Sequence, residues 1–131
     1  MSVALKIVDE TLSGEKTREF TLELVSSRIN ARELIRSRVR QEVEEYNARQ
    51  PEIYHGLVQP TETEKTLNGY RLRRRRKLDW REESEKAIEA FRRNGFLILV
   101  NDRQIESLDE EFVIDAGTKV TFIKLVPLVG G

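Results

Sequence analysis

The residues with the clearest chemical potential end the 131-residue sequence: Pro127, Leu128, Val129, Gly130 and Gly131. Packing does not account for two adjacent glycines at a terminus, because glycine has no side chain to bury and loses the most conformational entropy on ordering. A backbone without Cβ atoms can instead pass through a narrow channel into the active site of another protein. The carboxylate of Gly131 would then be the reactive group. The alternative interpretation is a frayed terminus, where glycine is unconstrained.

A run of basic side chains in the middle of the sequence is the second candidate site. It consists of Arg71, Arg73, Arg74, Arg75, Arg76 and Lys77. Such a run can bind phosphates, as in nucleic acid, or an acidic protein surface. The alternative is a solvated arm whose charge is balanced by nearby acids. The net charge of the whole sequence is +0, which argues against a general nucleic-acid binder and favours an acidic protein partner over nucleic acid.

The other reactive side chains do not form a recognisable catalytic or metal-binding set. The absence of cysteine excludes a disulfide, Cys-ligated zinc and a thiol nucleophile, so any thioester must use the sulfur of a partner. His55 has no companion histidine, and residues 109–111 are three consecutive acids that we expect in a solvated loop. No phosphate-binding glycine loop or nucleophile elbow is present. We therefore expect no catalytic residue, no bound metal or cofactor, and no enzymatic activity.

Length and composition predict one domain, residues 1–131, that buries roughly two-thirds of its unfolded surface. Charged residues make up 35% of the sequence and hydrophobic residues 38%, which indicates that part of the chain is solvated loop or hairpin. The first residues do not resemble a signal peptide, and no apolar stretch approaches the length of a membrane span. We expect a cytoplasmic protein without a membrane partner.

Two alternating segments near the start predict a β-hairpin. Apolar residues alternate with less apolar ones over residues 3–8 and again over residues 17–25. The polar stretch between them contains Gly14 and is typical of a turn. The two strands are therefore expected to pair with each other.

A long helix is predicted after this hairpin. Asn30 is placed to cap its start, Glu33 completes a capping box, and Pro51 is expected to end it. Its apolar stripe consists of Ile35, Val39, Val43 and Tyr46. The charged residues between them, which include Arg38 and Glu42, are assigned to the other faces of the helix.

Residues 47–95 are predicted to form an insertion that carries an exposed hairpin and a second helix. The dipeptide 68–69, Asn-Gly, favours a two-residue turn, because both central positions of such a turn need positive φ. It would join residues 63–67 to residues 70–77. Residues 53–58 are interpreted as a short edge strand or a loop.

The second helix is predicted from its ends. Asp79 is placed to cap its start, with Glu82 at the capping-box position. Asn94 and Gly95 are typical of a helix exit. Its modest apolar stripe consists of Ala87, Ile88 and Phe91.

The last third of the sequence predicts more strands. Residues 96–100 form a continuous apolar run, which favours a central strand buried on both faces. Residues 118–126 are predicted to be the final strand. The stretch between them contains four spaced apolar anchors, consistent with one or two short strands: Ile105, Leu108, Phe112 and Ile114.

This order of elements resembles the β-grasp fold of ubiquitin-like proteins and of the sulfur carriers of molybdopterin and thiamine biosynthesis. Residues 96–102 (FLILVND) look like the strand and turn that precede the closing segment of sulfur carriers. Residues 115–122 (DAGTKVTF) look like the glycine turn into their last strand. Residues 126–131 (VPLVGG) are similar to their proline-containing tails that end in two glycines. The resemblance implies an α+β class with a mixed sheet on one long helix.

The resemblance covers residues 1–46 and 96–131, whereas the segment from about 47 to 95 replaces a much shorter connection. With this insertion the sequence looks most like the bacterial ubiquitin-like modifiers, whose partners are E1-like, E2-like and JAB-type or other deconjugating peptidases. Antiviral defence is one process that this resemblance suggests. The resemblance also implies a flexible tail at residues 127–131.

The implied protein is a substrate of other enzymes. An E1-like partner would use ATP to adenylate the Gly131 carboxylate, and a thioester would then carry it to amines of target proteins. Pro127 would help to end strand pairing, because it has no amide donor and a fixed φ. Leu128 and Val129 would occupy a hydrophobic groove of the partner, and Gly130 would let the arm approach the reactive phosphate.

Two alternatives remain open. The protein would be a sulfur carrier if a sulfur donor attacked the adenylate and left a thiocarboxylate on Gly131. It would belong to a different class, a protein- or nucleic-acid-binding module, if the basic run at residues 71–77 carried its function and the terminal glycines did not.

Overall fold

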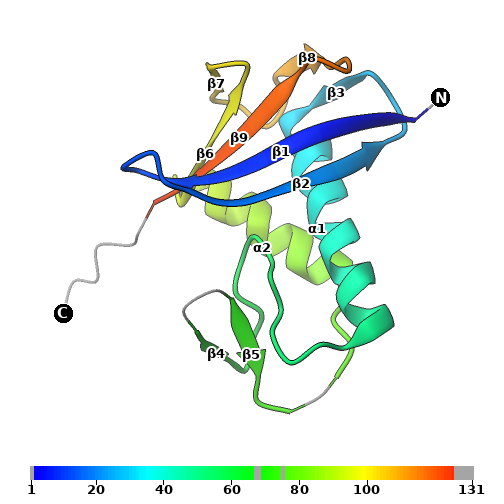
Figure 1. Cartoon of the computed structure of the whole chain (residues 1–131), viewed down its shortest axis with the longest axis vertical. Coiled ribbons are helices and arrows are strands. Elements are labelled where there is room, and N and C mark those ends of the chain that lie inside the picture. The colour runs from blue at the N-terminus through cyan, green and yellow to red at the C-terminus, as the bar shows by residue number, and fades with distance from the viewer. Residues whose placement is uncertain (1, 67–68, 75, 126–131) are drawn as a thin grey trace.

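The computed structural model describes residues 2–66, 69–74 and 76–125, which form an α+β fold with a mixed sheet and two helices. The elements follow the chain as β1 (Val3–Thr11), β2 (Lys16–Leu24), β3 (Arg28–Asn30), α1 (Ala31–Arg49), β4 (Thr63–Lys65), β5 (Tyr70–Leu72), α2 (Trp80–Arg92), β6 (Phe96–Val100), β7 (Arg103–Ile105), β8 (Glu111–Val113) and β9 (Lys119–Lys124). Figure 1 shows the main sheet at one end of the molecule and the β4–β5 hairpin at the other. The predicted α+β class is confirmed.

The central strands of the main sheet come from the two ends of the described chain. The order is β2-β1-β9-β6-β7, with β1 and β9 parallel and the other neighbours antiparallel. The predicted first hairpin is therefore confirmed as β1 and β2. Lys124, the last residue of β9, lies beside Thr11, the last residue of β1. The chain thus leaves the interior of the sheet next to the turn between β1 and β2 (Figure 1).

Helix α1 packs against one face of this sheet and begins and ends as predicted. The side chain of Asn30 accepts a hydrogen bond from the backbone N–H of Glu33 at 2.8 Å. The helix ends at Arg49, and Gln50 adopts a left-handed conformation with a φ of 42° just before Pro51. All four residues of the predicted apolar stripe are buried in the core.

Helix α2 is also capped as predicted, but its exit differs in one detail. Asp79 accepts a hydrogen bond from the N–H of Arg81. The left-handed residue at the other end is Asn94, with a φ of 60°, and not Gly95. A Cβ atom on Gly95 would lie 3.2 Å from the carbonyl oxygen of Ala90, so glycine serves close packing here. Among the described residues, neither helix is long and apolar enough to cross a membrane.

The prediction for residues 96–100 was right about the strand and wrong about its burial. β6 lies inside the sheet, between β9 and β7. Phe96, Ile98 and Val100 are buried on the side of α1, whereas Leu97 and Leu99 are only partly buried. Because no helix covers the second face of the sheet in Figure 1, the apolar run does not indicate two covered faces.

The short strands of the last third form two separate pairings. β7 pairs with β6 through a turn at Asn101 and Asp102, whose φ values are 48° and 71°. β8 pairs instead with β3, a strand that the sequence pattern did not predict. The four predicted anchors, Ile105, Leu108, Phe112 and Ile114, are all buried.

The insertion is part of the core rather than an appended arm. β4 and β5 are shorter than predicted, and their register corrects the expected turn at residues 68–69. Lys65 pairs with Tyr70, and the N–H of Thr66 donates to the carbonyl of Gly69 at 2.8 Å, so Gly69 lies in the second arm and not at the centre of the turn. Residues 67–68 lie outside the described residues. Residues 53–58 form a loop that contributes a single bridge, from Tyr54 to Tyr70. Tyr54, Leu57, Leu72 and Leu78 are buried in the same cluster as the residues of the sheet and α1. The hairpin is therefore anchored at its base, although its outer side chains are exposed.

Candidate functional site

The predicted reactive tail lies outside the described residues, which end at Leu125. The residues concerned are Pro127, Leu128, Val129, Gly130 and Gly131. The structure does describe the base of this tail. The N–H of Leu125 donates to the carbonyl of Gly95 at 3.2 Å, and Nζ of Lys124 donates to the carbonyl of Gly56 at 3.4 Å. Three segments, β9, the loop after α2 and the insertion, therefore meet where the tail begins.

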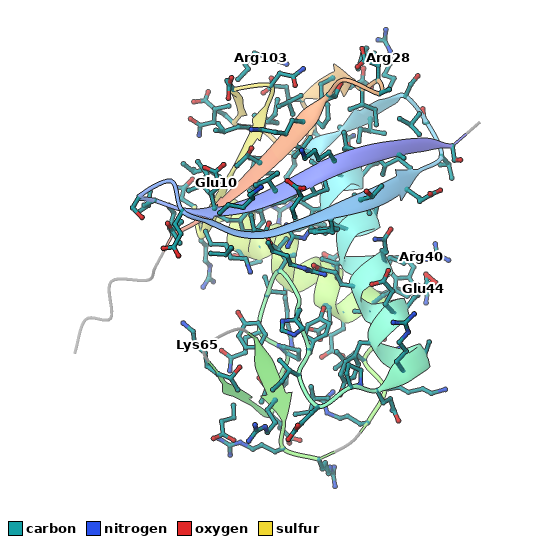
Figure 2. All side chains as sticks on the ribbon, in the orientation of Figure 1. Glu10, Arg28, Arg40, Glu44, Lys65 and Arg103 are labelled. Carbon is teal, nitrogen blue, oxygen red and sulfur yellow. The ribbon has the colours of Figure 1, made fainter. Side chains whose placement is uncertain are left out.

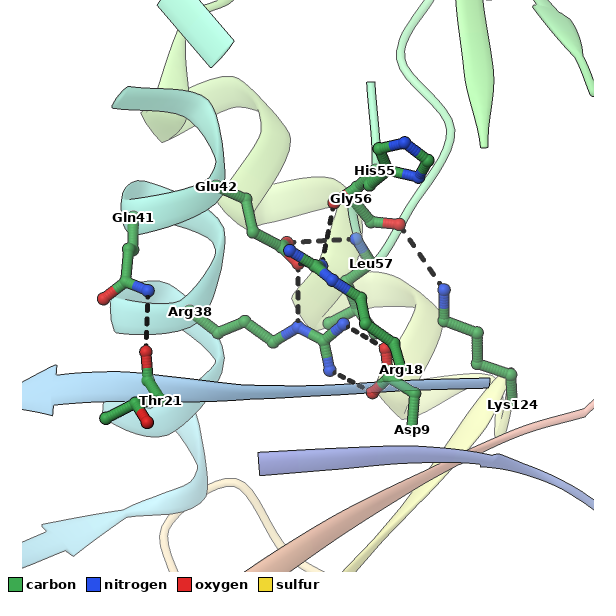
Figure 3. Close-up of polar contacts among 10 residues, drawn as sticks. All are labelled: Asp9, Arg18, Thr21, Arg38, Gln41, Glu42, His55, Gly56, Leu57 and Lys124. Carbon is green, nitrogen blue, oxygen red and sulfur yellow. Dashed lines mark hydrogen bonds and ion pairs between the residues drawn. The ribbon is translucent and has the colours of Figure 1, made fainter. Parts of the chain in front are cut away.

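A buried cluster of charged side chains lies beneath this end of the sheet (Figure 3). The guanidinium of Arg38 on α1 donates to both carboxylate oxygens of Asp9 on β1, at 2.6 and 2.7 Å. Its Nε donates to Oε2 of Glu42, one helical turn further along, at 3.1 Å. The Arg38 side chain is completely buried, and both carboxylates are nearly so. The two nearest anions thus satisfy three of its donors.

Two aromatic rings complete the surroundings of Arg38. The guanidinium carbon lies 4.9 Å from the ring centroid of Phe20 on β2 and 4.5 Å from that of Phe122 on β9. The negative faces of such rings attract a cation, and the attraction is stronger away from water. Arg38 is therefore held by anions at its edge and by rings at its faces.

Glu42 extends the cluster to the insertion. Its Oε2 also accepts a hydrogen bond from Nη1 of Arg18 on β2 at 2.9 Å, and its Oε1 accepts one from the N–H of Leu57 at 3.0 Å. Nη1 of Arg18 in turn donates to the carbonyl of His55 at 2.9 Å. One carboxylate thus joins β2 and α1 to the insertion. The cluster fixes the insertion against the part of the sheet where the tail begins.

The neighbours set the charge state of Arg38 and Lys124. Burial opposes the charge of Arg38, but Glu42 and Asp9 hold its pKa above the ordinary value. Burial lowers the pKa of Lys124, with Arg38 and Arg18 acting in the same direction and Asp9 and Glu42 against it. The cluster is a compact ionic contact rather than an open site, because no substrate can reach a fully buried guanidinium.

Arg38 and Glu42 were predicted to lie on the other faces of α1, away from its apolar stripe, and this prediction is wrong. Arg38 follows the buried Leu34 by four residues, and Glu42 follows Arg38 by four, so all three lie on the packed face. Asp9 likewise follows Leu5 and Ile7 on the inward face of β1. Acids and a base that fall on apolar stripes of neighbouring elements are the signal that could have revealed the cluster.

The structure divides the basic run into residues with different roles. Arg71 lies 3.8 Å from Glu52, and a guanidinium nitrogen of Arg76 donates to the carbonyl of Thr61. Arg75 lies outside the described residues. The remaining members, Arg73, Arg74 and Lys77, are exposed, and no ion pair among the described residues involves them. The described members of the run therefore differ in their contacts, and its role as a binding patch stays a prediction.

Two other sequence candidates play structural parts. His55 contributes its backbone carbonyl to Arg18, as described above. The three acids at 109–111 lie at the surface, but Glu111 is the first residue of β8 and is therefore not in a loop as predicted. Each acid is within ion-pair distance of an arginine: Asp109 with Arg32, Glu110 with Arg103, and Glu111 with Arg28. Figure 2 shows Arg28 and Arg103 at the end of the molecule opposite Lys65 of the hairpin. No group of three or more metal-ligating side chains occurs within the described parts of the chain.

Three buried polar atoms lack a hydrogen-bond partner among the described residues: Tyr54 Oη, Glu83 Oε1 and Ser84 Oγ. Burial raises the pKa of Glu83, against the influence of Lys86, whose Nζ lies 3.4 Å from the other carboxylate oxygen. Burial also raises the pKa of Tyr54, and the Glu42 and Glu83 carboxylates add to this effect. Uncompensated carboxylate burial at the start of α2 is therefore a local source of instability.

Replacing Glu83 with glutamine should remove a pH-dependent loss of stability. A raised pKa means that the folded state binds the proton of Glu83 more tightly than the unfolded state does. Proton binding therefore stabilises the fold fully below the ordinary glutamate value of 4.5, and this stabilisation is lost as pH rises through the folded-state pKa. We expect the unfolding free energy of Glu83→Gln, relative to the unchanged protein, to increase with rising pH over this window. Urea unfolding at a series of pH values measures it, and a constant difference would contradict it.

Comparison of the sequence with family models and curated proteins, and of the fold with solved structures, gave no match.

Proposed function

We propose that this protein is a ubiquitin-like modifier of the β-grasp type, and that an E1-like enzyme adenylates its Gly131 carboxylate for transfer to target amines. The observation that carries the proposal is the course of β9. This strand lies inside the sheet, between β1 and β6, and ends at Lys124. Beyond it the sequence continues to Pro127 and the two terminal glycines. A central strand offers a firm base for a tail that must enter another protein.

The arrangement of the elements supports the β-grasp part of the proposal. β1 and β9 are parallel neighbours, β2 and β6 flank them in antiparallel orientation, and α1 crosses one face. These elements come from the two segments, residues 1–46 and 96–131, that resemble ubiquitin-like proteins in sequence. The insertion joins the same core without interrupting the order of the five strands.

The chemistry requires a partner at each step. A Gly131 oxygen attacks the α-phosphate of ATP, pyrophosphate leaves, and the resulting acyl adenylate carries AMP as a good leaving group. A partner thiolate then displaces AMP to form a thioester, and a target amine displaces the thiol to form an amide. This chain supplies the acyl group and its delivery. A tail that ends in two glycines suits this task, because its backbone can approach the phosphate closely.

A sulfur carrier is the second candidate, and the similarity of residues 96–102 and 115–122 to that family favours it. Activation would be the same, but a sulfur donor would displace AMP and leave a thiocarboxylate. The large insertion favours the modifier, because sulfur carriers have a much shorter connection at this position.

Intact-mass measurement tests the proposal and separates the two candidates. Incubation with an E1-like enzyme, together with ATP and Mg²⁺, should add AMP to Gly131 or join Gly131 to the enzyme through a thioester. Expression with the whole pathway should then yield adducts on target lysines for a modifier. A mass gain equal to the difference between sulfur and oxygen would identify a carrier. If native protein carries residues beyond Gly131 that are never removed, both candidates fail.

A further inference from the structure

The insertion concentrates positive charge at one end of the molecule. Residues 61–77 contain seven lysines and arginines and two glutamates, a net charge of +5. Because the whole chain contains 23 basic and 23 acidic residues, the rest of the chain carries −5. The zero net charge of the chain is therefore the sum of a basic hairpin segment, residues 61–77, and an acidic remainder, which we call the body.

The structure identifies the cations of this segment that are free to bind. Arg71 is close to Glu52, and Arg76 is directed to Thr61, so both are occupied within the protein. Lys65 on β4 is exposed and forms no ion pair among the described residues, and the same holds for the three residues that follow β5: Arg73, Arg74 and Lys77. We call these three residues the arm. They lie between β5 and α2 in the sequence.

The arm is held at both of its ends. The N–H of Arg73 donates to the carbonyl of Glu62 at 3.2 Å, directly after the buried Leu72. Beyond Lys77, Leu78 is buried, and its N–H and carbonyl both bond to the Asn47 side chain of α1 at 2.8 Å. Cations presented between two anchored points lose less entropy on binding than cations on a free chain. This anchoring distinguishes the arm from a solvated tail.

We infer that the arm, Arg73, Arg74 and Lys77, is a docking surface for a short acidic segment of a protein partner. Guanidinium groups form charge-assisted hydrogen bonds with carboxylates, often in pairs. The inference does not depend on the tail, because the arm can bind whether or not Gly131 is activated. It goes beyond conjugation to a binding surface on the insertion.

Charge distribution favours an acidic protein segment over nucleic acid. DNA carries a negative charge about every 1.7 Å of its length, so it extends far beyond three cations. It would meet Glu62 and Glu64 beside the arm and then the body with its charge of −5, and salt screens these contacts only beyond about 8 Å. A short acidic peptide can end before it reaches them.

Base stacking offers no compensation near the arm. The ring of Trp80 is covered by two guanidinium groups, those of Arg40 at 4.9 Å and Arg81 at 4.8 Å. Tyr70 is partly buried and pairs with Tyr54 through the backbone. Single-stranded nucleic acid binds firmly when bases stack on open aromatic rings, and no such ring lies open here among the described residues.

Fluorescence anisotropy with a fluorescein-labelled decaglutamate peptide tests the inference on the full-length protein. We expect binding that weakens as salt is raised, and a loss of affinity of at least about tenfold in Arg73→Glu/Arg74→Glu. The matched control is Arg92→Glu/Arg93→Glu, which changes net charge equally at the exposed end of α2, where both arginines contact Glu89. It should bind the peptide within about twofold of the unchanged protein.

Three outcomes would overturn the inference. The first is an absence of peptide binding by the unchanged protein at low salt. The second is an equal loss in both double variants, which would indicate general attraction without a site. The third is tighter binding of a DNA duplex of about 20 base pairs than of the peptide at the same salt, lost in the arm variant, which would assign the arm to nucleic acid. Circular dichroism of each variant verifies that the fold is unchanged.

Discussion

The proposed function predicts that removal of Gly130 and Gly131 abolishes activation by an E1-like enzyme. The shortened chain would end at Val129. Its carboxylate would be two residues away from the position that the Gly131 carboxylate takes in the partner's active site, and it would lie next to a β-branched side chain. A displacement of about 1 Å at a reacting atom can reduce a rate about a hundredfold, and the shift here is larger. ATP–pyrophosphate exchange catalysed by the partner measures the effect directly. We expect no exchange above the level without this protein.

Two comparisons make this result specific to the tail. The shortened protein should unfold at the same urea concentration as the full chain, because β9 ends at Lys124 and the last core residue of the described chain is Phe122. Gly131→Ala retains the length of the tail and its carboxylate and adds one methyl group. It therefore tests whether the partner's channel is too narrow for a side chain, whereas the deletion tests the length of the tail. Exchange at the normal rate in the shortened protein, or unimpaired function in cells, would exclude both the modifier and the sulfur carrier.

The local start and end signals predicted both helices well, because each depends on neighbouring residues. Asn30 and Asp79 cap helices by bonds to backbone groups two or three positions away, which the sequence places without reference to the rest of the fold. β3 was missed for the opposite reason. It has three residues, and it exists because β8, distant in sequence, pairs with it.

The sequence was a weaker guide to the candidate sites. The rule that charged residues face water placed Arg38 outside, although its anionic partners Asp9 and Glu42 make it a core residue. In the basic run, the contact of Arg76 with the carbonyl of Thr61 depends on the fold of the insertion, which brings these two residues together. The assignment of the tail remains a prediction, since it lies beyond the described residues.

Replacing Arg38 with methionine should destabilise the protein by about 3–5 kcal/mol, because removal of one partner leaves buried charges without compensation. Asp9 would lose both of its hydrogen bonds to Arg38, and Glu42 would retain Arg18 and Leu57. Urea unfolding at neutral pH measures the loss. A cost below about 1 kcal/mol would show that the cluster does not behave as a buried ion pair.

Arg40→Met on the same helix is the matched control. Arg40 and Glu44 form an ion pair at 2.7 Å, shorter than several contacts of the cluster, but both side chains are more than half exposed (Figure 2). An exposed pair contributes about 0–1 kcal/mol, even with the stacking of Arg40 on Trp80. The two variants therefore compare the same substitution in water and in the core.

A double-mutant cycle can show whether Asp9 and Arg38 act as a unit. Asp9→Asn alone weakens a doubly hydrogen-bonded contact, and after Arg38→Met the same change should cost less or even stabilise, because it removes an uncompensated buried charge. We expect a coupling energy within the range of about 0.5–3 kcal/mol seen for residues in contact, and near its upper end. Additive effects would contradict the cluster.

Because Glu42 also holds Leu57, hydrogen exchange at the Leu57 amide in Glu42→Gln should reveal how firmly the cluster binds the insertion to the end of the sheet where the tail begins.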